Sequence, residues 1–210
     1  MTAVAELTVA GDRAAWSAVG LHVADDQATV GGIRIRFVDG PPALVSWSLA
    51  NLPEPVADID GLATIPVPAD PPSAPQIADE HPLGIVDFDH TVVMTSSLHR
   101  TCDAIAAATG EPLKRIREAG PIRQGFHRLG PMIIEVVENS QVSDDVAHFW
   151  GFVWNVADIA AAYRLLGSDL LSPPKAAVQP GRQIATFRAA AGLGIPVALM
   201  TVPPPRNTHG

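Results

Sequence analysis

A pattern of one strand, one helix and three strands occurs twice in this chain of 210 residues, and it limits the folds the chain can adopt. The first copy spans residues 85–138, where a strand carrying His90 opens the pattern and a strand carrying Glu135 closes it. A looser copy spans residues 148–202. When the two copies are aligned, Gly151 takes the position of His90, and Ala198 takes the position of Glu135. Each copy alone leaves one apolar sheet face uncovered, so we expect the two copies to pair.

The predicted fold class is therefore α+β, with paired βαβββ modules whose curved sheets surround a cleft. We assign the two modules to residues 83–138 and 146–202. Residues 1–52 follow the same order of elements more loosely and are predicted to form a divergent βαβββ-like module. Residues 53–82 include eight prolines and are interpreted as a linker or extended arm, because proline neither donates to a strand ladder nor continues a helix. Residues 203–210 form a tail.

Composition and charge narrow the class of partner. Charged residues make up 17% of the chain and hydrophobic residues 47%, which is typical of a globular protein, and the net charge of −8 is spread along the chain without an acidic run. Nucleic acid and anionic membranes are therefore not expected as main partners. The amino terminus lacks a signal-peptide pattern, and no apolar run reaches the roughly 20 residues of a membrane helix. We expect a cytoplasmic protein that binds a small molecule.

The helix of the first module carries the single cysteine. Ser96 and Ser97 are candidates for its N-cap, and Gly110 is suited to end it in the left-handed conformation. Cys102 shares the apolar stripe of this helix with Ile105 and cannot form an internal disulfide. A buried free thiol is favoured over a nucleophile.

Three segments carry a resemblance to a known family: FDHTVVMTSSLHRT, RQGFHRLGPMIIEVVE and FWGFVWNVADIAAA. They resemble the glyoxalase/bleomycin-resistance/dioxygenase superfamily, whose architecture is called the vicinal oxygen chelate fold. The run AVQPGRQIATFR is similar to one in actinobacterial glyoxalase-like domain proteins. The resemblance covers residues 83–202 well and residues 1–52 loosely. It implies the paired fold and, for activity, either a lyase or isomerase or a non-catalytic binding protein.

The resemblance also implies a divalent metal, such as zinc, nickel, manganese or iron. Side chains on the first and last strands of each module would hold it. His90 and Glu135 occupy these positions in the first module, whereas Gly151 and Ala198 in the second cannot coordinate through a side chain. A third ligand would have to come from His127 or from a partner subunit, since strand alternation turns His148 to the opposite face. The metal site is therefore predicted as incomplete, or absent with no cofactor at all, and a homodimer is expected.

Glu135 lies within an apolar run, so its carboxylate must be paired, hydrated or protonated. One interpretation is an ion pair with Arg123, Arg128 or His90 that shapes the sheet. The other is a catalytic role, with Glu135 as a general base or metal ligand and His90 beside it. In either case we expect His90 and Glu135 to lie together in the cleft.

Further side chains are candidates for binding the ligand. Arg123, Gln124 and Arg128, with Arg182 in the second module, either face solvent or form an anion site in the cleft. Gly151 is expected to leave space in the cleft. Because Trp150 and Trp154 alternate with Gly151, both are predicted to point away from the cleft into the core. The sequence therefore predicts a small-molecule enzyme acting through His90 and Glu135, or a protein that binds its ligand without chemistry.

Overall fold

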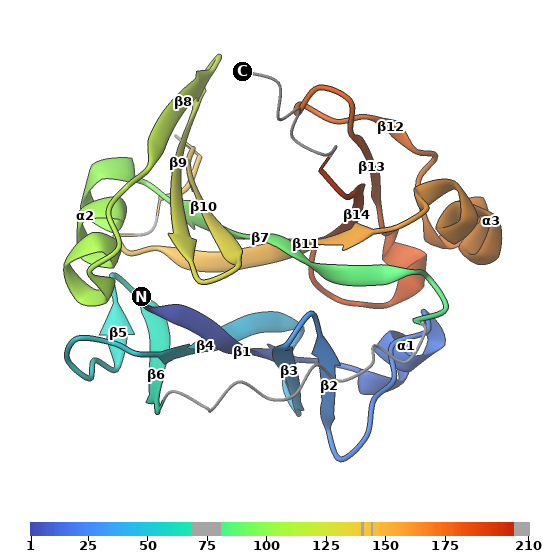
Figure 1. Ribbon diagram of the computed structural model, residues 1–210, viewed down its shortest axis with the longest axis horizontal. Helices are drawn as coiled ribbons and strands as arrows, with labels where there is room; N and C mark the ends of the chain where they lie inside the picture. The colour runs from blue at the N-terminus through green and yellow to red at the C-terminus, as the bar shows by residue number, and fades with distance from the viewer. Residues whose placement is uncertain (69–80, 140, 144, 204–210) are drawn as a thin grey trace, which may run out of the picture.

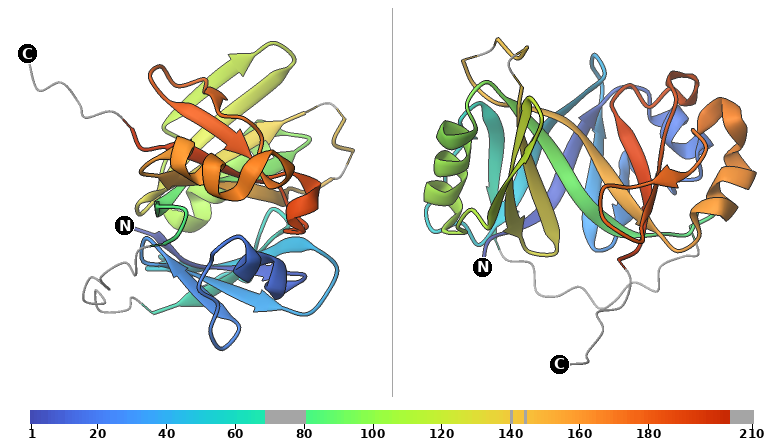
Figure 2. Two further views of the ribbon diagram at one scale, coloured as in Figure 1. Left: turned by 90° about the vertical axis from the view of Figure 1, so that its right-hand side faces the viewer. Right: turned by 90° about the horizontal axis from the view of Figure 1, so that it is seen from above.

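The computed structural model describes residues 1–68, 81–139, 141–143 and 145–203 of the chain. Within these residues the strands form two sheets stacked one above the other, and the larger sheet curves into a U shape that opens away from the smaller one (Figure 1). The two longer helices stand at the two ends of the larger sheet (Figure 2). In the described part of the chain, no helix is long and apolar enough to cross a membrane.

The smaller sheet is formed by the amino-terminal part of the chain. Its elements are β1 (Ala3–Ala10), α1 (Arg13–Ala18), β2 (Gln27–Val30), β3 (Ile33–Val38), β4 (Ala43–Ala50), β5 (Asp58–Ile59) and β6 (Leu62–Val67). The strand order is β2-β3-β1-β4-β6-β5. Strand β3 lies parallel to β1, whereas β4 lies antiparallel to β1 on its other side, with β6 parallel to β4.

The larger sheet is formed by the two predicted modules. Its elements are β7 (Ile85–Thr95), α2 (Leu98–Thr109), β8 (Arg115–Ala119), β9 (Ile122–Leu129), β10 (Met132–Glu138), β11 (His148–Val156), α3 (Ile159–Leu170), β12 (Lys175–Ala176), β13 (Gln183–Thr186), the short 3₁₀ helix η1 (Ala189–Ala191) and β14 (Val197–Thr201). The order is β12-β13-β14-β11-β7-β10-β9-β8. In each module the last strand lies parallel to the first. The first strands of the two modules, β7 and β11, pair antiparallel with each other and so join the modules. The predicted fold class of paired βαβββ modules is confirmed.

The helices begin and end where local chemistry predicts. The side chains of Asp12 and Asp158 accept hydrogen bonds from the first backbone N–H groups of α1 and α3. Gly110 ends α2 in the left-handed conformation, with φ of 72°. Ser97 occupies the N-cap of α2 without a side-chain hydrogen bond; the Glu138 carboxylate instead accepts from the Leu98 N–H at 2.6 Å, which ties α2 to the end of β10.

The amino-terminal part differs from the predicted βαβββ module. A fourth strand of such a module would lie parallel to the first, but β4 lies antiparallel to β1, as β11 does to β7. The smaller sheet therefore has a reduced form of the paired arrangement, with β1–β3 as one half and β4–β6 as the other.

The interpretation of residues 53–82 as a linker is wrong for residues 58–67, which form β5 and β6. Strand β5 pairs with β6 only at Leu62 and Ala63, so β6 has a neighbour on one side only at Pro66. Proline is tolerated at such an edge position because it needs no backbone N–H there. Residues 69–80 of this segment, and 204–210 of the predicted tail, lie outside the described residues.

Residues 21–23 form no strand, and the hairpin of β2 and β3 begins at the isolated bridge between Ala24 and Gln27. The helical turns after Gly167 in α3 continue to Leu170.

Aromatic side chains fill the space between the two sheets. Trp16 of α1 contacts Phe152 and Trp154 of β11, with ring centroids 5.9 and 6.0 Å apart, and Trp47 of β4 contacts Phe149 of β11 at 5.3 Å. One continuous apolar core thus contains residues of both sheets. The smaller sheet covers the outer face of the modules rather than one of their edges, which leaves the inner face of the U free.

We predict that Trp16→Ala lowers the free energy of unfolding by about 3–5 kcal/mol, because it removes a fully buried aromatic side chain between the two sheets. Chemical denaturation followed by circular dichroism measures this change. Trp150→Ala is the matched control: this tryptophan is 48% exposed, and its loss should cost less than about 1 kcal/mol. Equal effects of the two substitutions would contradict the shared core.

Candidate functional site

A cavity of about 500 Å³ lies on the inner face of the larger sheet. Its walls come from both modules, so neither module forms it alone. The lining residues of the first module and the following loop are His90, Val92, Met94, Ile122, Glu135, Val137 and Asn139, and those of the second are Trp150, Phe152, Val153, Ile184, Thr186, Pro196, Val197 and Ala198. Apolar side chains predominate, and His90 and Glu135 are the lining residues with ionisable side chains.

Irregular pairing between β7 and β11 determines which side chains reach this cavity. His90 pairs with Val153 and Phe88 with Trp154, so Asp89 is an extra residue on β7. A β-bulge of this kind allows two consecutive side chains to serve the same side of a strand. Asp89 and His90 therefore contact each other, although strict alternation would separate them.

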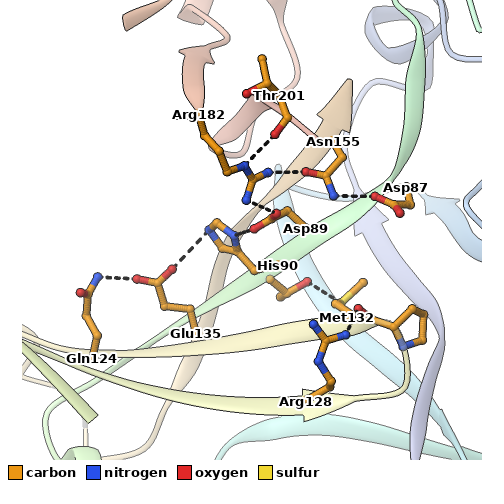
Figure 3. A network of polar contacts seen from close by, with 12 residues as sticks. Asp87, Asp89, His90, Gln124, Arg128, Met132, Glu135, Asn155, Arg182 and Thr201 are labelled. Atoms are coloured by element: carbon orange, nitrogen blue, oxygen red, sulfur yellow. Dashed lines mark hydrogen bonds and ion pairs between the residues drawn. The ribbon is translucent and has the colours of Figure 1, made fainter. Parts of the chain in front are cut away.

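His90 and Glu135 meet in the cleft, as predicted. Nε2 of His90 lies 3.3 Å from Oε2 of Glu135, and the two side chains are 10% and 14% exposed. Gln124 of β9 donates a hydrogen bond to the other carboxylate oxygen, Oε1 (Figure 3). This hydrogen bond orients the carboxylate, because one oxygen is held by the amide and the other faces the imidazole.

A buried ionic network lies behind the imidazole. Nδ1 of His90 lies 2.7 Å from Oδ1 of Asp89, and Oδ2 of Asp89 lies 2.7 Å from Nη1 of Arg182. Arg182 also donates from Nη2 to Asn155 Oδ1 at 2.5 Å and from Nε to the carbonyl oxygen of Thr201 at 2.7 Å (Figure 3). The Asn155 amide in turn donates to Asp87 at 2.6 Å. The contacts form a continuous chain from Gln124 on β9 to Asp87 on β7.

The network defines where His90 carries its proton. Burial raises the pKa of Asp89 and is the largest single effect, but the contacts with His90 and Arg182 together outweigh it and hold this pKa below its ordinary value. A charged Asp89 only accepts, so Nδ1 of His90 donates. Nε2 then faces the Glu135 carboxylate at 3.3 Å.

The residues present do not fit a divalent metal. The Glu135 carboxylate occupies the approach to Nε2 of His90. Gly151 and Ala198 offer no donor in the second module. Among the described residues, no group of three or more His, Cys, Asp and Glu side chains is arranged to hold a cation, whereas such sites have at least three protein ligands.

The two other histidines considered as third ligands lie elsewhere. His127 pairs with Ile134, a core residue, and its Nδ1 donates to the Glu111 carbonyl oxygen on the outer side of the sheet. Burial is the main reason that the pKa of His127 is lowered. His148 was expected on the opposite face. It pairs with Met94 instead, on the cleft face but four residues along β7 from His90.

The predicted ligand-binding side chains separate into different places. Arg123 lies on the outer side, where it contacts Glu138 and His99 of α2, and does not line the cavity. Arg128 is exposed near the end of β9 and donates to the Pro131 carbonyl oxygen. Arg182 is 7% exposed and fully engaged in the ionic network. Of the four polar candidates, Gln124 contacts the site directly, and Arg182 supports it from behind.

Gly151 does not leave space in the cleft. A Cβ atom at this position would lie 2.0 Å from the carbonyl oxygen of Pro196, so the glycine is required by a close backbone approach. The same region explains why Trp150 was misplaced. Phe149 pairs with Val93 and Gly151 with Val92, which makes Trp150 an extra residue that turns into the cavity. Trp154 is fully buried, as predicted.

Sequence reasoning missed Asp89 and Asn155. Asp89 precedes His90 directly, and an adjacent carboxylate is a signal for an oriented imidazole. Alternation argued against it, because the bulge was not visible. Asn155 pairs with Asp87 across the two modules, which requires knowledge of the register.

Comparison with known proteins finds solved structures that are similar to part of this chain at low sequence identity. No family model and no curated protein matches the sequence. A solved methylmalonyl-CoA epimerase from Mycobacterium tuberculosis is 13% identical, with 58% of this chain and 91% of the epimerase covered and a TM-score of 0.49. The Streptomyces coelicolor methylmalonyl-CoA epimerase in complex with 2-nitronate-propionyl-CoA is 15% identical, with 56% and 97% covered and a TM-score of 0.46. A hypothetical protein from Bacillus halodurans is 12% identical, with 56% and 95% covered and a TM-score of 0.47.

The fold is assigned from the topology of this chain and not from these structures, whose TM-scores lie below 0.5. The topology carries the assignment: two βαβββ modules joined through their first strands, with a cavity on the inner face of one curved sheet. The chain has the vicinal oxygen chelate fold and so resembles, in architecture, the glyoxalase/bleomycin-resistance/dioxygenase superfamily.

We predict that Arg182→Gln lowers the free energy of unfolding by about 3–5 kcal/mol at pH 7, because it leaves the buried Asp89 carboxylate without its cation. The double variant Arg182→Gln, Asp89→Asn should recover part of this loss. Denaturation of the four proteins in a double-mutant cycle measures the coupling. Additive effects would contradict a direct ion pair.

The same ion pair predicts a pH dependence. Since folding lowers the pKa of Asp89, its contribution to stability is complete above the unfolded value of about 3.9 and is lost as pH falls through the folded value. The wild-type protein should therefore lose more stability in this acidic range than Asp89→Asn. Parallel pH profiles of the two proteins would be the contrary result.

Cys102 should resist alkylation in the folded protein. Burial, with a smaller effect of Asp103, raises its pKa to about 12, and its Sγ fills the space beside Gly125. The thiolate is the nucleophile, so iodoacetamide at pH 8 should modify the unfolded chain and leave the native chain unmodified. Mass spectrometry measures the difference. Rapid modification of the native protein would contradict the assignment as an inert core thiol.

Proposed function

We propose that the protein is an isomerase or lyase that moves a proton on a small carbonyl compound, with His90 and Glu135 as the acid and base. One observation carries the proposal: an imidazole and a carboxylate face each other at 3.3 Å in the wall of a cavity. The proposed steps use these side chains alone, because the residues at the site do not fit a divalent metal.

The roles follow from the surroundings of each side chain. Glu135, oriented by Gln124, takes a proton from the carbon next to the carbonyl, and the C–H electron pair moves into an enolate. His90, whose Nδ1 donates to Asp89, turns its Nε2–H from the Glu135 carboxylate to the developing enolate oxygen once that carboxylate has taken up the substrate proton. The proton then returns to carbon, which completes an isomerisation, or a neighbouring group leaves, which completes a lyase reaction.

The apolar walls support this chemistry. Val92, Val137 and Val153 surround the pair and exclude water from the reacting atoms. A charge that develops in such a site is stabilised mainly by fixed donors rather than by solvent. The network through Asp89 and Arg182 holds the imidazole before the substrate arrives, so little reorganisation is needed.

We predict that the protein catalyses exchange of acidic C–H protons with solvent deuterium. Small ketones, 2-oxo acids and thioesters incubated in D₂O are followed by loss of their C–H signals in proton NMR. Glu135→Gln should reduce the exchange rate by roughly 100- to 10,000-fold, the range for removal of a general base. His90→Gln should reduce it as well, because the donor to the enolate oxygen is lost.

Arg128→Gln is the matched control, since Arg128 is polar, lies on the same sheet and donates only to a carbonyl oxygen at the end of its strand. Its exchange rate should equal that of the wild type. If the wild-type protein accelerates exchange for none of these compounds, or if Glu135→Gln is as active as the wild type, the catalytic proposal fails.

A second candidate function is ligand binding without chemistry. The observation in its favour is that Glu135 already has contacts on both oxygens, from Gln124 and His90, in a largely apolar cavity. A binding or sequestering protein would show no exchange, and Glu135→Gln would leave its affinity for the ligand intact. The exchange experiment therefore separates the two functions.

A further inference from the structure

The second module contains a small apolar cluster that is separate from the main core, and Val153, Ile184 and Ala198 of this cluster line the cavity. Val153, Ala198 and Met200 are its buried members, and Ile184 and Ala177 pack against it partly buried. The main core lies on the other face of the sheet and contains none of these residues. An apolar cluster that faces a cavity rather than a second layer of the protein is a surface on which a ligand can be buried.

The cluster stands where the second module lacks polar groups. In the second module, Ala198 occupies the position equivalent to Glu135 and provides no carboxylate. The carbonyl group of Pro196 fills the space beside Gly151. Trp150, turned inward by the bulge and 48% exposed, adds an aromatic wall to the same cavity. The two modules therefore differ in kind: the first presents His90 and Glu135, and the second presents hydrocarbon.

The register places this surface directly beside the imidazole. His90 pairs with Val153, Val153 with Ala198, and Ala198 with Thr186. Because neighbouring strands are about 4.8 Å apart, Ala198 lies roughly 10 Å from His90. Thr186 follows on the next strand and ends the apolar row with its hydroxyl. The row is wide enough for one ring or a short branched chain.

We propose that this surface, formed by Val153, Ile184, Ala198 and Met200 with Trp150 as its edge, is a subsite for an apolar substituent of the substrate. This inference rests on the proposed function. The apolar substituent is attached to the same carbonyl group whose neighbouring C–H bond is placed at His90 and Glu135. The ligand class is a carbonyl compound with one hydrocarbon group, alkyl or aryl, and its polar end is directed towards the first module.

Three ketones test the subsite: acetone, cyclohexyl methyl ketone and acetophenone, which share a carbonyl and differ in the hydrocarbon group. Binding is measured by NMR of protein labelled with ¹³C at the methionine methyl groups. Met94 lines the cavity and Met200 lies in the apolar cluster, whereas Met132 is fully buried on the opposite face and serves as an internal control. The Met94 and Met200 signals should shift together and saturate, while that of Met132 stays in place.

Both ring ketones should bind more tightly than acetone, by roughly 4-fold for each CH₂ equivalent buried. The comparison of cyclohexyl methyl ketone with acetophenone shows whether an alkyl or an aryl group fits better, and either order supports the subsite. Equal affinity for all three ketones, or shifts of Met132 as large as those of Met94, would overturn it.

Two variants locate the surface. Ile184→Gln should weaken both ring ketones at least about 4-fold and leave acetone unchanged. Leu165→Gln, at a position 62% exposed on α3, is the matched control and should have no effect. Thr186→Val, which extends the apolar row without adding volume, should tighten the ring ketones and provides a test that does not depend on a destabilising change. Unchanged ring-ketone affinity in both Ile184→Gln and Thr186→Val would overturn the subsite.

Glu135→Gln separates this proposal from the proposed function. It should abolish deuterium exchange while the ring ketones keep their advantage over acetone. If the ring ketones bind as described but the wild-type protein exchanges no protons, the subsite stands and the catalytic proposal fails. If exchange occurs but the ring ketones bind no more tightly than acetone, the catalytic proposal stands and the subsite fails.

Discussion

The antiparallel pairing of β7 with β11 is the constraint on which the rest of the molecule depends. It joins the two modules into one curved sheet and, on its outer face, supplies the aromatic side chains against which the amino-terminal sheet packs. Its irregularities are equally important. One extra residue at Asp89 and another at Trp150 change which side chains face the cavity. A regular ladder would bury Asp89 on the other side and leave the imidazole without its partner.

The ion pair between Asp89 and Arg182 fixes the two halves relative to each other at the site. Both side chains are 6% exposed, and a buried pair stabilises a fold only when its remaining polar atoms are also satisfied. Here Asn155 and the Thr201 carbonyl oxygen satisfy the rest of the guanidinium. A residue of the second module thus orients the imidazole of the first, which explains how a module without reactive side chains still serves the site.

Much of the fold follows from the sequence because its signals are local. The pairing of the two modules was predicted from their repeated order of elements, and the caps at Asp12, Asp158 and Gly110 follow from their residue types. The meeting of His90 and Glu135 follows from their positions in the first and last strands of a module. The roles of Gly151, Trp150 and Arg182 do not follow, because each depends on a register shift or on a loop reaching across the modules. Alternation is reliable only where a ladder is regular.

The central claim is that Asp89 holds the imidazole of His90 so that its Nε2 faces the Glu135 carboxylate. The most direct measurement is ¹⁵N NMR of the imidazole of His90 in the wild type and in Glu135→Gln. The account predicts a protonated Nδ1 in both proteins, because Asp89 accepts there, and a change in the Nε2 signal when the carboxylate is removed. A proton on Nε2 with an unprotonated Nδ1 in the wild type, or identical Nε2 signals in the two proteins, would contradict it.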